Sequence, residues 1–327
     1  MAKAKPFIKW VGGKTQLIEQ LDAQLPADFG NWKDVTYIEP FIGGGAMLFY
    51  MLQQYPNIKR AVINDINEDL IICYKTVRDN VEGLITSLKE IESNYYALQS
   101  EEARKEFFMN VREKYNTKNL DSIENTTLFF FLNRTCFNGL YRVNKKGLFN
   151  VPFGKYEKPQ ICDEVTLRLD SKLLKNVEIL SGDFEATLQH AKGNTLFYFD
   201  PPYRPLSNTS SFNDYAKESF NDCAQIRLKE YCDLINEAGY SFMLSNSDCK
   251  GQNEEDNFFD VLYHDYIIER VFASRSINAN PSKRGKITEI LVHNYFETKY
   301  NSQKRNCIEQ VLFFEDVLNH TQAVNQQ

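Results

Sequence analysis

The chain has few residues of the kinds that build metal sites or disulfide frameworks. Its 327 residues include seven cysteines and four histidines, which are scattered along the sequence. No two cysteines form a C-x-x-C pair, and the histidines stand far apart. This spacing disfavours a zinc site, and the odd number of dispersed cysteines indicates reduced thiols rather than disulfides. We therefore expect no metal cofactor.

Long apolar runs are also absent. No stretch approaches the ~20 consecutive apolar residues that are needed to cross a bilayer. The segment Met1–Lys5 carries two lysines and continues into Phe7-Ile8-Lys9-Trp10, without the apolar core of a secretory signal. The sequence therefore predicts a cytoplasmic protein that makes no contact with a membrane.

An overall basic charge, which many nucleic-acid-binding proteins carry, is missing as well, since the formal net charge is −6. The basic residues are nevertheless concentrated in two segments. Leu132–Gln160 holds six Lys or Arg residues against one acid, and Arg270–Lys286 holds five and no acid. Neutralising phosphates needs only local positive charge, so the two basic segments could form a polyanion-binding face. A pair of solvated loops explains the same charge equally well.

Three short runs of strand-forming residues each lead into an acid. They are residues 35–38 before Glu39, 60–63 before Asn64-Asp65, and 195–199 before Asp200. Alternation of such strands with helical stretches predicts an α/β fold with a mostly parallel sheet. Ligands bind beyond the carboxyl ends of the strands in these sheets, so we expect the acids to share one rim.

The middle of the chain has a different pattern. Residues 69–118 are rich in helix formers, and 133–153 alternate short apolar pieces with hairpin-type turn signals. We therefore divide the chain into an outer α/β domain of residues 1–70 and 160–315, an inserted domain of residues 71–159, and a C-terminal tail of residues 316–327. The inserted domain is expected to contain helices followed by a basic β-hairpin at about 134–155.

Asp200-Pro201-Pro202-Tyr203 directly follows the strand 195–199. Two prolines cannot continue a β ladder, so the chain must leave the sheet there as a stiff loop. The loop brings a carboxylate, free carbonyls and an aromatic ring to the functional rim. An amine that attacks a methyl group needs acceptors for its N–H protons, and a planar base needs a ring to stack on. The tetrapeptide supplies both, although an ordinary turn has the same form.

Glycines follow the first strand, in the segment Tyr37–Gly45, and let the backbone approach a ligand closely. The segment does not fit G-x-G-x-x-G, because Leu48 stands at the third glycine position, so a pyrophosphate cofactor is disfavoured. Asp65 follows the next strand, where an acid can accept hydrogen bonds from ribose hydroxyls. Gly13-Lys14-Thr15 is not a P-loop, because Ile8 occupies the first glycine position of that motif.

Taken in order, these motifs resemble those of the Dam-type, or alpha-class, DNA adenine-N6 methyltransferases. The similar segments are KWVGGK at 9–14, EPFIGGG at 39–45, NDIN at 64–67, NRTCFNGLYRVNKKGLFNVPFGKYEKP at 133–159, SGDF at 181–184, DPPY at 200–203 and RSINAN at 275–280. The long middle block is the most specific, whereas DPPY occurs across amino-methylating enzymes. The resemblance implies a Rossmann-like S-adenosylmethionine-dependent methyltransferase sheet, with the inserted domain recognising the DNA target.

The implied reaction is methyl transfer from S-adenosylmethionine to N6 of a flipped adenine in double-stranded DNA, within GATC, by direct in-line displacement that leaves S-adenosylhomocysteine. A cognate restriction endonuclease acting at the same site is a further implied partner. Asp65 would hold the ribose, and Asp183 and Phe184 the adenine ring. The cofactor-binding residues implied by the resemblance are Trp10, Gly12, Lys14, Phe41, Gly43, Gly45, Asp65, Asp183, Phe184 and Asp200.

The implied catalytic residues are Asp200, Pro201, Pro202 and Tyr203. Asp200 and the Pro201 carbonyl would accept from the target amine, and Tyr203 would stack on the flipped base. The resemblance implies DNA contacts by Lys9, Arg134, Phe137, Asn138, Leu140, Arg142, Pro152 and Lys155.

Within that DNA-contacting set, Arg142 would read guanine through O6 and N7, and Leu140 and Pro152 would contact thymine methyls. Phe137 would wedge into the base stack, and Lys155 would meet phosphate. The family pattern has tyrosine where this chain has Phe137, so any role of a hydroxyl group is lost there.

Other substrates are compatible with the same pocket. An N-methyltransferase of RNA, of protein glutamine or of small molecules could share the cofactor site and DPPY, but it would not need the basic hairpin. Cytosine-N4 methyltransferases usually have Ser in place of Asp at the start of the tetrapeptide. A DNA-binding protein with a relic pocket would be expected to have lost Asp200 or the glycine loop, and both are present.

Overall fold

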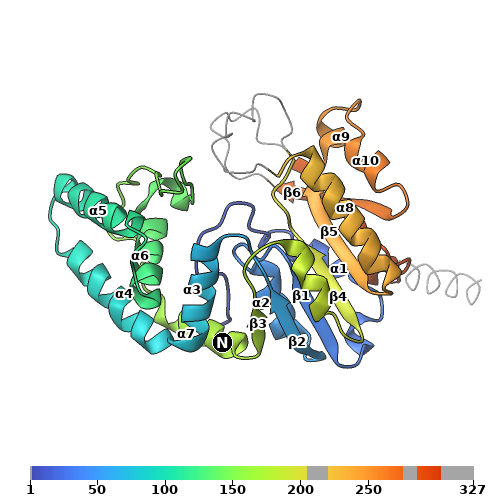
Figure 1. Cartoon of the computed structure of the whole chain (residues 1–327), viewed down its shortest axis with the longest axis horizontal. Coiled ribbons are helices and arrows are strands. Elements are labelled where there is room, and N and C mark those ends of the chain that lie inside the picture. Colours follow the sequence, from blue (N-terminus) through green and yellow to red (C-terminus); the bar gives the residue numbers. More distant parts are fainter. Residues whose placement is uncertain (1, 205–219, 275–285, 303–327) are drawn as a thin grey trace, which may run out of the picture.

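The computed structural model describes residues 2–204, 220–274 and 286–302. RSINAN at 275–280 and the tail at 316–327 therefore lie outside the described residues. The described chain forms an α/β layer structure around one sheet, with a helical extension at one side (Figure 1).

The sheet has seven strands in the order β3-β2-β1-β4-β5-β7-β6. They are β1 (Val35–Glu39), β2 (Ile58–Ile63), β3 (Val177–Ile179), β4 (Thr195–Phe199), β5 (Ser241–Ser247), β6 (Ile267–Ser274) and β7 (Lys286–His293). Strands β1 to β5 pair in parallel, and β7 runs antiparallel to both β5 and β6. The predicted strands are β1, β2 and β4, and the α/β prediction is confirmed. Strand order reverses between β1 and β4, which is where open α/β sheets bind ligands.

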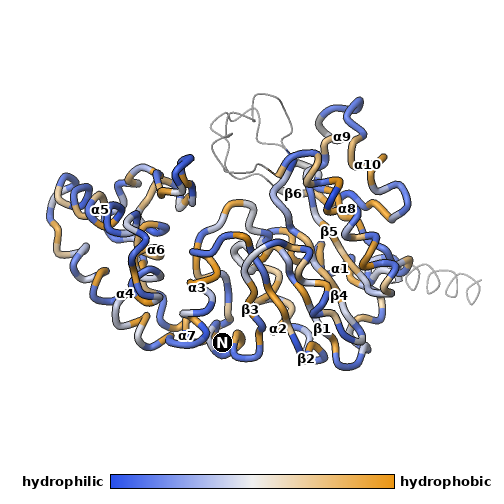
Figure 2. Tube along the Cα trace, viewed as in Figure 1, coloured by the Kyte–Doolittle hydropathy of each residue, from blue (hydrophilic) through white to orange (hydrophobic). Residues whose placement is uncertain are grey.

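Side chains of the central strands alternate between two clusters, one on each face of the sheet. Tyr37 and Tyr198 belong to one cluster, whereas Ile38 and Phe197 belong to the other. The first face is covered by α1 (Ile18–Ala23), α2 (Ala46–Gln54) and α3 (Glu68–Asp79). The second is covered by the 3-10 helix η3 (Phe184–His190), α8 (Asp222–Glu237), α9 (Cys249–Gln252) and α10 (Phe258–Leu262). Figure 2 shows the resulting hydrophobic centre.

The helical extension contains α4 (Val81–Tyr96), α5 (Glu101–Asn116), α6 (Ser122–Thr135) and α7 (Glu164–Leu174). Ser100, Asp121 and Asp163 cap three of these helices, each accepting from the N–H three residues on. Helix α6 is buried from Asn125 to Asn133 among α3, α4 and α5. Its side chains join the cluster on the first face of the sheet, so the core is continuous across residue 71. The domain boundaries at 71 and 159 stay a prediction.

After α6 and the 3-10 turn η2 (Phe137–Gly139), the chain returns on itself. Within this segment the bridges Cys136–Phe153 and Val143–Phe149 join the two arms at separate points, without regular strands. The backbone N–H and carbonyl of Phe149 point away from the opposite arm and bond to the side chain of Asn116 in α5. These two bonds hold this arm against α5. The expected hairpin is an antiparallel loop, which we call the basic loop (residues 136–155).

Other features agree with the composition. None of the described helices is long and apolar enough to cross a membrane. The six described cysteines are free, and four of them are buried as small apolar side chains. The remaining described 3-10 helix, η1 (Phe29–Asn31), precedes β1.

Candidate active site

The acids at the ends of the strands meet at the reversal of strand order. Glu39 ends β1, Asp65 follows β2 and Asp200 follows β4. The ends of β1 and β2 are joined by the Asn64 N–H, which donates to the Glu39 carbonyl at 2.9 Å. The amide of Gly43 donates to Oδ2 of Asp65 at 3.1 Å and so ties the glycine loop to the same place. The expectation of one shared rim is confirmed.

Asp200 has donors on one of its two carboxylate oxygens. Nζ of Lys14 lies 3.1 Å from Oδ1, and the Ser245 hydroxyl donates to the same oxygen at 3.2 Å. Among the described residues no donor reaches Oδ2, and 22% of the Asp200 side chain is exposed. Burial raises the pKa of Asp200 to about 6, and the ammonium of Lys14 limits the rise. At neutral pH the group is therefore a carboxylate with one open acceptor.

The rest of the tetrapeptide is anchored to two neighbouring elements. The Pro202 carbonyl accepts from Nε2 of Gln225 in α8 at 3.2 Å. The Tyr203 hydroxyl donates to Oε2 of Glu289 in β7 at 2.6 Å. Nζ of Lys14 lies 4.2 Å from the centre of the Tyr203 ring, so one face of the ring already holds a cation. Only the other face is available to a stacked base.

The chain directly after the tetrapeptide 200–203 is fixed by Arg204, which sequence reasoning missed. Arg204 pairs with Asp222 at 2.7 Å and with Asp256 at 2.6 Å, and its guanidinium lies 4.5 Å from the centre of the Phe258 ring. Sequence reasoning also missed the polar residues that support the site from other elements: Gln225, Ser245, Asn246 and Glu289. The available signal was a polar residue inside an otherwise apolar strand, as in β5 and β7.

The glycine loop is packed so closely that side chains do not fit. Gly43 and Gly45 have φ values of 46° and 73°. An added Cβ would lie 2.9 Å from Cδ1 of Trp10 at Gly43, and 2.5 Å from Oη of Tyr74 at Gly45. The loop is thus held on the rim between Trp10 and α3, next to Asp65.

Asp65 and an aromatic pair flank this loop. The two oxygens of Asp65 accept the Gly43 and Asn67 amides, at 3.1 and 2.9 Å, and burial raises its pKa. Each oxygen keeps a second lone pair for a further donor. The rings of Phe41 and Phe184 lie 5.2 Å apart. These groups fit S-adenosylmethionine, which needs acceptors for its ribose hydroxyls and apolar surface for its adenine.

Asp183 is more fully engaged than sequence reasoning expected. Its carboxylate accepts the Glu185 amide at 3.0 Å at the start of η3 and forms an ion pair with Arg227. The Arg227 guanidinium also lies 4.5 Å from the centre of the Phe184 ring. Phe184 lies beside Phe41, but Arg227 already occupies part of the surface of Asp183 and Phe184.

The N-terminal segment links the glycine loop and Asp200 to the basic loop. Asn133 of α6 bonds to both the N–H and the carbonyl of Lys9, each at 2.8 Å. The Trp10 ring stacks on Tyr141 at 5.5 Å between centres. The Gly12 carbonyl accepts from Nζ of Lys14 at 3.2 Å. The segment 9–14 therefore runs from the basic loop to Asp200.

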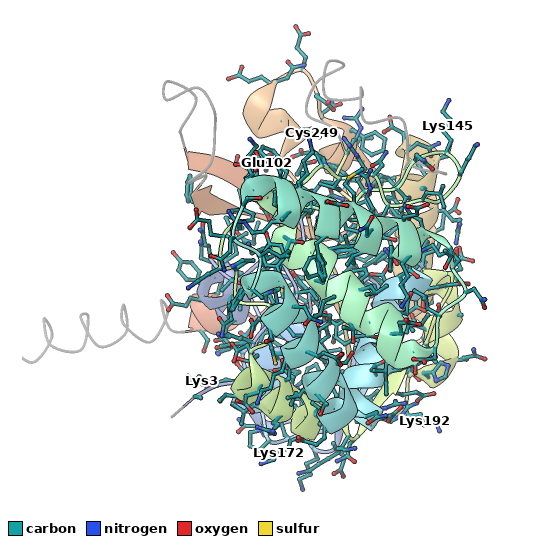
Figure 3. All side chains as sticks on the ribbon, turned by 90° about the vertical axis from the view of Figure 1, so that its left-hand side faces the viewer. Lys3, Glu102, Lys145, Lys172, Lys192 and Cys249 are labelled. Atoms are coloured by element: carbon teal, nitrogen blue, oxygen red, sulfur yellow. The ribbon has the colours of Figure 1, made fainter. Side chains whose placement is uncertain are left out.

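Most residues expected to contact DNA lie together on or beside the basic loop. Phe137 is 51% exposed, Leu140 is half-buried, and the exposed members are Lys9, Asn138, Arg142, Pro152 and Lys155. In Figure 1 this loop lies on the upper side of the molecule, the side toward which β4 leads into Asp200. Figure 3 shows its Lys145 at the same end of the molecule as Cys249, opposite Lys172 and Lys192.

Three of the basic residues differ in their partners. Nε of Arg142 donates to Oδ1 of Asn150 at 2.8 Å, and Lys155 pairs with Glu101 of α5 at 2.8 Å. Arg134 stands apart from the others, because its guanidinium points inward and donates to the Phe7 carbonyl at 2.7 Å. Burial lowers the pKa of Arg134.

Comparison with known proteins places this geometry in a family. A model described as D12 class N6 adenine-specific DNA methyltransferase matches residues 10–277. Type II methyltransferase M.MjaIII of Methanocaldococcus jannaschii is 48% identical over 296 residues, which cover 90% of this chain and 100% of that protein. Type II methyltransferase M1.LlaDCHI of Lactococcus lactis is 39% identical, with 89% and 95% covered, and the DNA adenine methylase of Haemophilus influenzae is 33% identical, with 88% and 93% covered. The chain therefore belongs to the D12 class of N6 adenine-specific DNA methyltransferases.

Proposed function

We propose that this adenine-N6 DNA methyltransferase modifies the adenine of GATC in duplex DNA, with Asp200 holding the target amine. The observation that carries the proposal is that Lys14 holds both Asp200, whose Oδ2 accepts no hydrogen bond from the described residues, and the ring of Tyr203 at the reversal of strand order. Adenine N6 needs acceptors for its protons and its ring needs a flat partner, and both lie at this one point.

The tetrapeptide 200–203 offers acceptors for the two N–H protons of adenine N6, and those that already have a partner are excluded. The N6 lone pair of adenine is conjugated into the ring and is a weak nucleophile. Oδ2 of Asp200 accepts one N–H, and the Pro201 carbonyl accepts the other, since the Pro202 carbonyl is bound by Gln225. Both hydrogen bonds shift electron density toward the attacking nitrogen. Most of the rate gain comes from positioning and from electrostatic stabilisation.

S-Adenosylmethionine supplies the methyl group as part of a sulfonium. Asp65 receives the ribose hydroxyls through its remaining lone pairs, and the adenine ring packs against the outer surface of the Phe41 and Phe184 pair. The glycine loop provides the close backbone approach. No metal ion is needed for this displacement.

Lys14 belongs to the transfer site as well as to the cofactor pocket, because it contacts Asp200 and Tyr203. The target adenine must leave the duplex to reach these residues, at a cost of a few kcal/mol. Stacking on the open face of Tyr203, worth ~1–3 kcal/mol per base, offsets part of that cost.

The basic loop reads the sequence. Arg142 recognises guanine, Leu140 and Pro152 contact thymine methyls, and Phe137 enters the stack beside the extruded base. Asn138 and Lys9 complete the contacts, and Lys155 exchanges its exposed partner Glu101 for a phosphate. We assign Arg134 to the support of the N-terminal segment, because it faces inward.

Two of the relatives are named Type II methyltransferases. We propose that this chain likewise protects DNA from a cognate restriction endonuclease that cuts the same site, without direct contact between the two proteins. We also propose that the reaction takes place in the cytoplasm, where the protein meets its DNA substrate.

The test uses duplexes that contain GATC and duplexes with each single-base substitution. After incubation with S-adenosylmethionine, methylation-sensitive digestion and labelled methyl incorporation are measured on each. Incorporation that is confined to GATC supports the proposal. Equal incorporation into substituted sites would withdraw the GATC assignment, and methylation of RNA or protein in preference to duplex DNA would favour the corresponding alternative substrate.

A further inference from the structure

We infer that Glu289 in β7 is a positioning residue for methyl transfer, which orients Tyr203 through its hydroxyl and shares Lys14 with Asp200. The inference rests on the proposed roles of Asp200 and Tyr203. Nothing in the sequence motifs marks Glu289, which lies outside all of them.

A single oxygen of Glu289 joins two parts of the site. Oε2 accepts the Tyr203 hydroxyl at 2.6 Å and lies 3.5 Å from Nζ of Lys14. The same ammonium lies 3.1 Å from Oδ1 of Asp200. Lys14 is therefore held between two carboxylates, and the stacking ring is tied to one of them.

Glu289 lies at a largely buried position in the sheet, where a carboxylate contributes nothing favourable to packing. Its neighbours in β7, Ile290 and Leu291, are buried in the two opposite clusters. The Glu289 side chain is only 15% exposed. A carboxylate in such a place is unfavourable unless it has partners, and Tyr203 and Lys14 are those partners.

The hydrogen bond fixes the direction of the Tyr203 ring. A tyrosine ring with a free hydroxyl can swing about its side-chain bonds, whereas a ring anchored at both ends presents one defined face. With Lys14 on one face, the other face is held ready for the base. Loss of the anchor should therefore lower the rate of transfer.

The charge of Glu289 acts separately on Asp200. Charged and titratable groups reach Asp200 from every element around it: Lys14 from the N-terminal segment, Glu39 from β1, Tyr198 from β4, Tyr203 from its own loop and Glu289 from β7. The negative charge of Glu289 raises the pKa of Asp200, so its removal makes the Asp200 carboxylate easier to form. The acid limb of the activity profile then moves to lower pH.

Two substitutions separate the anchor from the charge. Glu289→Gln keeps an acceptor for the Tyr203 hydroxyl and loses the charge, whereas Glu289→Asp keeps the charge and shortens the reach. Glu269→Gln in β6 is the matched control, since it removes the same charge from the adjacent strand and Glu269 makes no ion pair with any described residue. The readouts are kcat and KM on a GATC duplex from about pH 5 to 8, with the melting temperature.

We expect Glu289→Gln to move the acid limb downward by roughly half a pH unit or more. Glu289→Asp should lower kcat by about tenfold, with the acid limb near its wild-type position. Glu269→Gln should change neither. An unmoved acid limb in Glu289→Gln, or wild-type kcat in Glu289→Asp, would overturn the inference.

Two further outcomes are distinguished. If neither Glu289 variant folds while Glu269→Gln does, Glu289 serves folding alone and the inference is wrong. If Asp200→Asn keeps full activity, the proposed function itself fails, whatever the Glu289 variants show.

Discussion

Lys14 and Asp200 form an ion pair of 3.1 Å that joins the N-terminal segment to the end of the central strand β4. The Lys14 side chain is 5% exposed, and its ammonium also lies over the Tyr203 ring. The pair leaves the second oxygen of Asp200 open. It also keeps the pKa of Asp200 near 6 despite the burial that raises it.

The first prediction follows from this pair. Lys14→Met removes a cation that lowers the pKa of Asp200, so the acid limb of kcat/KM should move upward by roughly one pH unit, equivalent to ~1.4 kcal/mol. The direction is opposite to that expected for Glu289→Gln. A pH profile measured beside Lys33→Met, an exposed lysine before β1, checks it. Equal profiles for the two lysine variants would show that Lys14 does not act on Asp200.

The second prediction concerns the cofactor pocket. Asp65→Ala should weaken S-adenosylmethionine binding, because the ribose hydroxyls lose a charged acceptor worth ~1.5–3 kcal/mol. Asp65→Asn keeps one acceptor oxygen and should lose less. Calorimetry measures the cofactor affinity of both variants. Melting curves show whether either variant also loosens the Gly43 loop, whose amide donates to Asp65. Unchanged affinity in the alanine variant would place the ribose elsewhere.

The third prediction separates two residues of the basic loop. Arg142→Ala should lose activity on GATC and relax the preference for guanine, because a bidentate guanine contact gives ~1–3 kcal/mol of discrimination. Lys155→Ala should weaken binding to all sequences in parallel and lower the salt slope by about one phosphate contact. Both variants are measured on GATC and on substituted sites across a salt series. Parallel losses would make the loop an electrostatic clamp only.

The fourth prediction concerns the buried acid of β1. Glu39 is 2% exposed and accepts the Tyr37 hydroxyl at 2.6 Å, and burial raises its pKa from 4.5 to about 8. A raised pKa contributes stability that is complete below the ordinary pKa and is lost as pH rises through about 8. The free energy of unfolding should therefore fall by roughly 2 kcal/mol between about pH 6 and 9.

The matched variant for that prediction is Glu39→Gln, which cannot titrate and should lack this part of the pH dependence. Urea unfolding at several pH values, with the wild type in parallel, measures the difference in slope. Identical slopes would mean that Glu39 is ionised in the folded chain throughout the range.

The rim of the sheet could be predicted because its strands carry their own signals. The runs that became β1, β2 and β4 are short, rich in β-forming residues and followed by acids, so their shared edge follows from parallel pairing. The glycine loop was likewise visible, and the close packing against Trp10 and Tyr74 explains why glycine is required there.

The supports of the site could not be predicted in the same way. Glu289 and Ser245 reach Asp200 or its neighbours through pairing of distant strands, and no spacing along the chain encodes that contact. The basic loop is held in place by Asn116, which bonds to Phe149 from a separate helix. The inward direction of Arg134 depends on the course of the N-terminal segment.

The most direct test of the central claim is nucleoside analysis of duplex DNA after reaction with S-adenosylmethionine. Wild-type protein and Asp200→Asn are compared by mass spectrometry on a GATC duplex, with cofactor binding of both confirmed by calorimetry. The account predicts N6-methyladenine with the wild type and a loss of at least about a hundredfold with Asp200→Asn, while the affinity for the cofactor stays within about tenfold, or ~1.4 kcal/mol. Wild-type levels of N6-methyladenine from Asp200→Asn, or N4-methylcytosine as the wild-type product, would contradict it.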